Sequence, residues 1–131
     1  MKKFLITILL FLVPCSLFLT GCGGIAYKHL THEEARDLIA ADQSVIVLDV
    51  RSPEEYEKKH IPNALSVPIE ELREGNFDSL PNKDAKILIY CWTGRRAEDA
   101  AAILSEHGYK NVYEFGGLVD WTGSVVGTEI K

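Results

Sequence analysis

The sequence predicts one α/β domain in which a parallel β-sheet carries helices on both faces. Two apolar, β-branched runs, 45–50 and 86–90, have the length and composition of strands that are buried on both sides. Helix-start signals alternate with these runs along the chain, and such alternation is typical of parallel sheets. With an apolar N-terminal segment set aside, the remaining residues suffice for one hydrophobic core and not for two.

The first half of the domain contains two capping boxes, each a Ser or Thr followed three residues later by Glu. The first predicts a helix over 31–41, and the second, with Pro at the first helical position, predicts a short helix over 52–59. Strand 45–50 lies between these helices. A turn at 61–64 and a short strand at 65–67 follow them.

The second half continues the alternation of strands and helices. Residues 70–80 provide one or two helical turns interrupted by a Gly-Asn pair, and strand 86–90 comes next. Apolar positions at helical spacing predict a helix over 96–107, which ends before a glycine. A last strand over 112–115 leads through two glycines into a short helix at 118–121. Because ligands bind at the carboxyl ends of parallel strands, the ends of the two buried strands are the expected place for a site.

Cys91 stands at the carboxyl end of the second buried strand and opens the run Cys-Trp-Thr-Gly-Arg-Arg, 91–96. A strand, a glycine-containing turn and a helix in this order place a thiol among backbone N–H groups, and the helix N-terminus adds about half a positive charge. These surroundings favour the thiolate, which is the nucleophilic form. A cysteine that merely closes a core strand is the alternative, but the adjacent Arg95 and Arg96 favour a reactive thiol.

The N-terminal segment has the pattern of a secretory signal: a basic start, an apolar run over 4–20, and small residues before Cys22. Its 17 residues, broken by Pro14, fall short of the ~20 that a membrane-spanning helix needs. The run Leu-Thr-Gly-Cys at 19–22 resembles the lipobox of bacterial lipoproteins. This resemblance implies cleavage before Cys22 and acylation of its sulfur. A retained membrane anchor and a signal cut elsewhere are the alternatives.

This interpretation divides the chain into a lipoprotein signal peptide at 1–21, a short tether at 22–26, a folded domain at 27–123 and a C-terminal tail at 124–131. The mature chain would carry 12 basic and 19 acidic residues, a formal charge of −7, which argues against nucleic-acid binding. Several acyl chains would hold the domain at the membrane. We expect an exported, periplasm-facing protein of the bacterial cell envelope, located in the outer membrane if the host is Gram-negative.

Cysteine usage predicts a single thiol in the mature chain. Cys15 would leave with the signal peptide and Cys22 would carry lipid, so Cys91 has no internal partner for a disulfide. A lone thiol in an oxidising compartment is either inert and buried or kept for chemistry. Four histidines without a cysteine cluster give no zinc-ligand spacing, and no metal or other cofactor is expected.

Several ordered motifs resemble the rhodanese domain family. Asp-Val-Arg at 49–51, Glu-Tyr at 55–56 and His-Ile-Pro-Asn-Ala at 60–64 look like its Asp-x-Arg, Glu-Tyr and His-Ile-Pro-Gly-Ala signature. The run 91–96 looks like its active-site loop, and Phe-Gly-Gly-Leu at 115–118 followed by Trp looks like its terminal segment. Within the family the chain is most similar to the small exported single-domain rhodaneses of the phage-shock protein E type. Its one change in the signature is an Asn for the usual turn Gly, and Asn tolerates positive φ.

The resemblance implies a rhodanese-like fold, with a central parallel sheet of five strands, and sulfurtransferase activity. The thiolate of Cys91 would attack the outer sulfur of a donor such as thiosulfate. The resulting Cys91 persulfide would pass this sulfur to a thiophilic acceptor, either cyanide or a thiol. Beyond the donor, the acceptor and the membrane no partner is implied, and we expect a monomer.

The resemblance also implies roles for the residues around the thiol. The active-site loop that binds the substrate and holds the sulfur charge with backbone N–H groups would consist of Trp92, Thr93, Gly94, Arg95 and Arg96. Arg95 would face the mouth of the site and attract an anionic donor, while Arg96 would close the loop by pairing with a nearby acid. The residues expected to support the loop, rather than to take part in catalysis, are Asp49, Arg51 and His60.

Two other functions stay open from the sequence. Phosphatases and arsenate reductases on this fold use a Cys-x5-Arg loop, whereas only four residues separate Cys91 from Arg96. The shorter loop suits a single sulfur atom better than a tetrahedral oxyanion. A rhodanese-like domain can also serve as a non-catalytic binding or scaffold module at the cell envelope, although the intact cysteine loop favours an enzyme.

Overall fold

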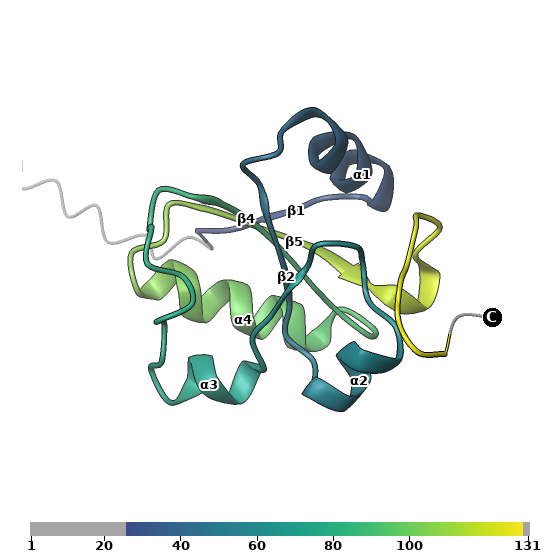
Figure 1. Ribbon diagram of the computed structural model, residues 1–131. Coiled ribbons are helices and arrows are strands. Elements are labelled where there is room, and N and C mark those ends of the chain that lie inside the picture. The colour runs from purple at the N-terminus through teal and green to yellow at the C-terminus, as the bar shows by residue number, and fades with distance from the viewer. Residues whose placement is uncertain (1–25, 130–131) are drawn as a thin grey trace, which may run out of the picture.

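A five-stranded, all-parallel sheet in the order β1-β5-β4-β2-β3 forms the centre of the protein (Figure 1). The computed structural model describes residues 26–129. Its elements, in chain order, are β1 (Lys28–His29), α1 (His32–Ala41), β2 (Ile46–Asp49), α2 (Pro53–Lys58), β3 (Leu65–Ser66), α3 (Ile69–Arg73), β4 (Lys86–Cys91), α4 (Arg95–Glu106), β5 (Asn111–Gly117) and the 3-10 helix η1 (Leu118–Asp120). The predicted α/β class with a parallel five-stranded sheet is confirmed.

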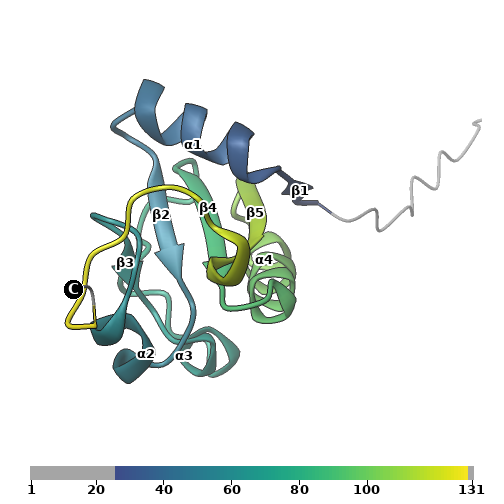
Figure 2. The ribbon, with the colours of Figure 1, turned by 90° about the vertical axis from the view of Figure 1, so that its right-hand side faces the viewer.

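Successive residues of β4 point to opposite faces of the sheet and enter two different cores. Ile87, Ile89 and Cys91 pack in a core with side chains of α3 and α4. Leu88 and Tyr90 pack in a second core with side chains of α1 and η1. Figure 2 shows α1 and α4 on opposite sides of the sheet. Cys91 therefore ends the central strand on the face that α4 covers.

Both predicted capping boxes are present and fix where α1 and α2 begin. The Thr31 hydroxyl accepts a hydrogen bond from the Glu34 N–H, and the Glu34 carboxylate accepts one from the Thr31 N–H. Ser52 and Glu55 form the same reciprocal pair at α2, where Pro53 is the first helical residue. Each box satisfies two backbone donors that the helix itself leaves free, and a cap is worth about 1 kcal/mol.

Strands β1 and β5 differ from what the sequence predicts. β1 has two exposed residues and no apolar run, so only its pairing with β5 defines it as a strand. β5 continues through Gly117 instead of ending at 115, because a bulge shifts its register against β4 between Ile89 and Cys91. Gly116 has φ +85°, a left-handed conformation that favours glycine, and this residue allows the strand to bulge and continue.

The C-terminal residues run back along α2. Val126 and His60 pair through two backbone hydrogen bonds of 2.8 Å. The N–H groups of Thr128 and Glu129 donate to backbone carbonyls of α2. The last described residues are thus fastened to the domain.

Residues 26–129 include no helix with the length and apolarity needed to cross a membrane. The predicted signal peptide, its cleavage site and Cys22 lie outside the described residues.

Candidate active site

The chain turns from β4 into α4 directly over the sulfur of Cys91. Gly94 is the N-cap of α4 and has φ +106°, where an L side chain would be strained. In this conformation the Gly94 N–H donates to the Cys91 sulfur, with 3.0 Å between nitrogen and Sγ. The positive end of the 12-residue helix α4 follows at once. Both features stabilise a negative charge on the sulfur.

The surroundings of Cys91 differ in two ways from a loop in which several backbone N–H groups surround an accessible sulfur. Within residues 26–129, the Gly94 N–H is the one backbone donor at hydrogen-bond distance from the sulfur, instead of several from the loop. Cys91 is also only 1% exposed, because its side chain joins the core under α4 and the loop folds back over it. The sulfur is therefore almost fully covered in this structure.

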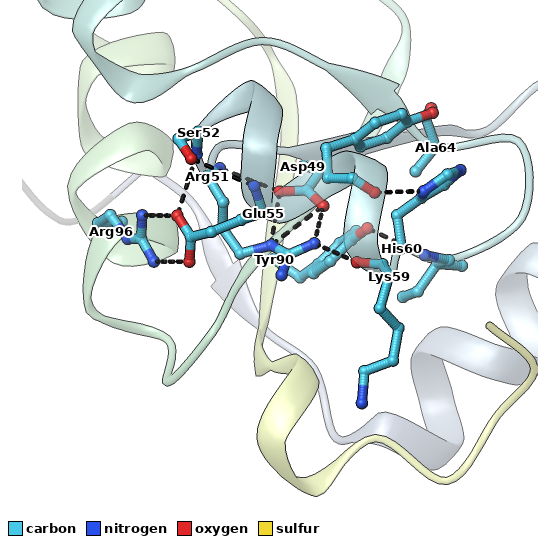
Figure 3. A network of polar contacts seen from close by, with 11 residues as sticks. Asp49, Arg51, Ser52, Glu55, Lys59, His60, Ala64, Tyr90 and Arg96 are labelled. Carbon is cyan, nitrogen blue, oxygen red and sulfur yellow. Dashed lines mark hydrogen bonds and ion pairs between the residues drawn. The ribbon is translucent and has the colours of Figure 1, made fainter. Parts of the chain in front are cut away.

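Arg96 forms a bidentate ion pair with Glu55 of α2. Its Nη1 and Nη2 donate to Oε2 and Oε1 of Glu55 at 2.8 Å and 3.0 Å (Figure 3). Hydrogen bonding to Arg96 lowers the pKa of Glu55 to about 2. Hydrogen bonding to Glu55 raises the pKa of Arg96, and the nearby Cys91 sulfur adds to this increase. Arg96 therefore stays cationic near the sulfur, and Glu55 fixes the orientation of the Arg96 guanidinium.

Replacing Glu55 with Gln is expected to lower the free energy of unfolding by up to about 1 kcal/mol near neutral pH, since the pair is partly exposed and screened. The carboxyl pKa in the folded protein lies below its ordinary 4.5, so the stabilisation is complete above that pH and fades as pH falls toward about 2. Urea unfolding of both proteins near neutral pH and near pH 3 checks this. A stability difference that does not shrink at the lower pH would contradict an ionic contribution of Glu55.

Asp49 and Arg51 form a buried ion pair where β2 ends; their exposures are 0% and 2%. The Arg51 Nε and Nη2 donate to the two carboxylate oxygens of Asp49 at 3.0 Å and 2.7 Å, and Nη2 also donates to the Lys59 carbonyl at 2.6 Å (Figure 3). Burial and the neighbouring Asp49 charge raise the pKa of Tyr90, so its phenol stays neutral beside the pair. This network joins the ends of β2 and α2 to β4.

His60 lies in a packed, hydrogen-bonded position next to α2. Its ring stacks on Tyr56 with 3.7 Å between centroids, and Nδ1 lies 2.7 Å from the Tyr56 carbonyl oxygen. The Tyr56 hydroxyl in turn donates to the Ala64 carbonyl at 2.6 Å. Asn63, in the same turn, has the positive φ of 63° that its place in the signature predicts. These contacts hold the turn against α2.

Trp92, Thr93 and Arg95 are the exposed side chains of the loop. Trp92 is 39% exposed, and the Lys59 ammonium lies over its ring, 5.6 Å from the centroid. Beside Trp92 lies a hollow of about 240 Å³ whose other walls are charged side chains: Arg51, Glu55, Lys58, Lys59 and Glu129. This hollow lies next to the cysteine loop, and two of its lining side chains, Lys58 and Glu129, form an ion pair across 3.6 Å.

Comparison with known proteins identifies the family. Residues 31–124 match the rhodanese-like domain. The chain belongs to the rhodanese-like domain family. Thiosulfate sulfurtransferase PspE of Escherichia coli (strain K12) is 40% identical over 73 residues, which cover 56% of this chain and 70% of PspE. Thiosulfate sulfurtransferase GlpE of Coxiella burnetii (strain RSA 331 / Henzerling II) is 34% identical over 96 residues, which cover 72% of this chain and 87% of GlpE.

A solved structure shows the same likeness in three dimensions. The chain described as rhodanese with anions from E. coli aligns with a TM-score of 0.58 at 36% identity, covering 64% of this chain and 99% of that one. The rhodanese-like identity that the motifs predict is thus confirmed.

Two acidic residues around this rhodanese-like site are absent from the sequence-based set of site residues. Glu55 belongs to a recognised motif and to a capping box, but its separation of 41 positions from Arg96 conceals their pairing. Glu114 is a carboxylate within the apolar run 112–115. A charged residue inside a buried strand needs polar partners, so its presence in this run indicates a polar contact near the site.

Proposed function

We propose that the protein is a sulfurtransferase that carries sulfur as a persulfide on Cys91. In the first step, the Cys91 thiolate bonds to the outer sulfur of thiosulfate, the S–S bond of thiosulfate breaks, and sulfite leaves with the electron pair. In the second step, cyanide or a thiolate bonds to the outer persulfide sulfur and the Cys91 thiolate is released. The observation that carries the proposal is the Gly94 N–H directed at Sγ where β4 meets α4.

The neighbouring groups have separate tasks in this scheme. The Gly94 N–H stabilises the sulfur anion in the thiolate and in the persulfide. Arg96 keeps a positive charge near the sulfur because Glu55 holds its guanidinium. The exposed Arg95 attracts an anionic donor. Thiosulfate is the donor favoured by similarity, since both relatives described above are named thiosulfate sulfurtransferases.

Mass spectrometry of the protein after exposure to thiosulfate tests the proposal. We expect a gain of one sulfur atom on the peptide that contains Cys91, and its loss, with release of thiocyanate, when cyanide is added. Peptide mapping is needed because Cys15 and Cys22 are further thiols of an unprocessed chain. No phosphate release from a phosphate ester is expected. A protein that gains no sulfur from thiosulfate or from any persulfide donor would refute the proposal.

A non-catalytic binding or scaffold module is the second candidate function. The 1% exposure of Cys91 favours it, because a sealed thiol cannot meet a donor. The same experiment separates the two candidates: sulfur uptake requires that the loop admits thiosulfate, whereas a scaffold needs no access to the sulfur.

We also propose that the protein is a lipoprotein anchored to the membrane through Cys22. The support is the lipobox-like run at 19–22 together with the start of β1 at Lys28, only six positions beyond Cys22. A linker of this length spans at most about 20 Å at ~3.5 Å per residue, so the domain would stay close to the membrane surface.

Replacing Cys22 with Ala is expected to leave the chain unacylated, because the sulfur that accepts the lipid is gone. The protein should then be either free of the membrane or uncut, and mass spectrometry with membrane fractionation in the host distinguishes these. Cys15→Ala is the matched control and should retain acylation and cleavage. Correctly cut, membrane-bound Cys22→Ala protein would contradict the anchor.

A further inference from the structure

Glu114 is a buried carboxylate that the proposed mechanism does not use. It lies on β5 and is 3% exposed. Its Oε1 is 2.5 Å from Nδ1 of His29 on β1, and its Oε2 accepts a 3.0 Å hydrogen bond from the Gly116 N–H. Burying a charged group is costly unless hydrogen bonds satisfy it. Glu114 therefore has a fixed place between the edge strand and the bulge of β5.

The bulge at Gly116 lies directly against the Cys91 loop. A Cβ placed on Gly94 would come 3.2 Å from the Cα of Gly116, and one placed on Gly117 would collide with the carbonyl oxygen of Trp92. The Trp92 carbonyl also accepts a 3.0 Å hydrogen bond from the Val119 N–H. The backbone of the bulge therefore contacts the backbone of the Cys91 loop with no side chain between them. A displacement of the bulge displaces the loop as well.

We propose that Glu114 is a positioning residue for the Cys91 loop. Its carboxylate holds the Gly116 N–H, the Gly116 backbone supports Gly94, and the Gly94 N–H holds the sulfur. The effect on sulfur transfer rests on the proposed function. The effect on the reactivity of the thiol does not, since it follows from the geometry of the loop alone.

A positioning effect and a purely electrostatic effect of Glu114 have opposite signs. Removing a buried negative charge would by itself favour the Cys91 thiolate and speed its reactions. Losing the bond to Gly116 would release the bulge and with it Gly94, so that the thiolate loses its donor and a smaller share of the thiol is ionised at neutral pH. A released loop also uncovers the sulfur, which is 1% exposed, so the ionised share has to be measured separately from access. Gln at position 114 keeps an oxygen for the Gly116 N–H and an amide for His29, whereas Leu has a similar size and offers neither.

Alkylation of Cys91 by iodoacetamide, followed by peptide mass spectrometry on the full chain, tests this role. The rate at neutral pH is divided by the rate near pH ~10, well above the ordinary thiol pKa of about 8.5, so that differences in access cancel in the ratio. This ratio is expected to fall roughly tenfold in Glu114→Leu, as for loss of one hydrogen bond to an anion. Glu114→Gln should stay within about twofold of the wild type, because the acceptor for Gly116 is retained. In sulfur transfer from thiosulfate, kcat of Glu114→Leu should fall with this ratio while KM is unchanged, because Arg95 is untouched.

Tyr109→Phe is the matched control, because it removes a buried hydrogen bond, from the Tyr109 hydroxyl to the Leu80 carbonyl, and Tyr109 follows the end of α4 opposite to the loop. It should lower the melting temperature without changing alkylation. Glu114→Val, which suits a strand, replaces the Leu variant if that variant does not fold. A folded Leu or Val variant whose rate ratio is at or above that of the wild type overturns the inference, and so does a Gln variant whose ratio falls as much as that of Leu. If alkylation gives the expected results but the protein takes up no sulfur, the sulfurtransferase proposal is refuted and the positioning role of Glu114 is not.

Discussion

Replacing Cys91 with Ser is expected to reduce sulfur transfer to the background rate and to leave the fold intact. A hydroxyl is smaller than a thiol, and the Gly94 N–H that now donates to the sulfur can donate to the hydroxyl oxygen instead. Near neutral pH the hydroxyl is not ionised and forms no persulfide, so the covalent route is lost. Removing the nucleophile of a covalent enzyme costs several orders of magnitude in rate. Thiocyanate formation from thiosulfate and cyanide measures the loss, and thermal unfolding reports on the fold.

Cys15→Ser is the matched control for this experiment, because it makes the same exchange at a cysteine outside the described residues. It should leave the rate unchanged. Turnover of Cys91→Ser well above background would mean that another group carries the sulfur. Equal inactivity of the wild type and the variant would favour the binding-module function.

The sheet and its helices could be predicted because short-range patterns encode them. The capping boxes give the starts of α1 and α2, and the β-branched run 86–90 gives β4. β1 could not be predicted in this way, since it consists of two exposed residues that form a strand only through pairing with a partner 85 positions away. The bulge in β5 likewise depends on pairing with β4. From the sequence alone, its two glycines are equally typical of a turn.

The same distinction between local and long-range features applies to the site. The place of Cys91 at a strand-to-helix junction follows from neighbouring residues and could be predicted. The number of amides that meet the sulfur could not, because it depends on the backbone angles of Gly94 and its neighbours. The burial of the thiol depends on how closely α4 packs on β4, and the identity of the acid that holds Arg96 depends on where α2 comes to lie.

Replacing Arg51 with Met is expected to lower the free energy of unfolding by about 3–5 kcal/mol, because it leaves the Asp49 carboxylate buried without its ion-pair partner. This is a large share of the about 5–15 kcal/mol that stabilises a typical domain. The change also removes the 2.6 Å hydrogen bond to the Lys59 carbonyl, which ties the end of α2 to β2. Urea unfolding near neutral pH measures the effect. Arg73→Met is the control, since Arg73 pairs with Asp99 at the exposed surface and its loss should change stability by less than about 1 kcal/mol.

A double variant, Asp49→Leu with Arg51→Met, shows whether the unpaired charge is the cause. Replacing both members of a buried ion pair with apolar residues costs far less than removing one, because no charge is left without a partner. We therefore expect the double variant to be more stable than Arg51→Met alone, although the Arg51 N–H, which now donates to Asp49 at 3.0 Å, loses its acceptor. If the double variant were the less stable of the two, the hydrogen bond that Asp49 accepts from the Arg51 N–H would outweigh the cost of the unpaired charge, because the Arg51 side chain is missing from both variants. A single variant as stable as the wild type would mean that water or a nearby donor replaces the guanidinium, and the pair would then not be what holds the ends of β2 and α2 together.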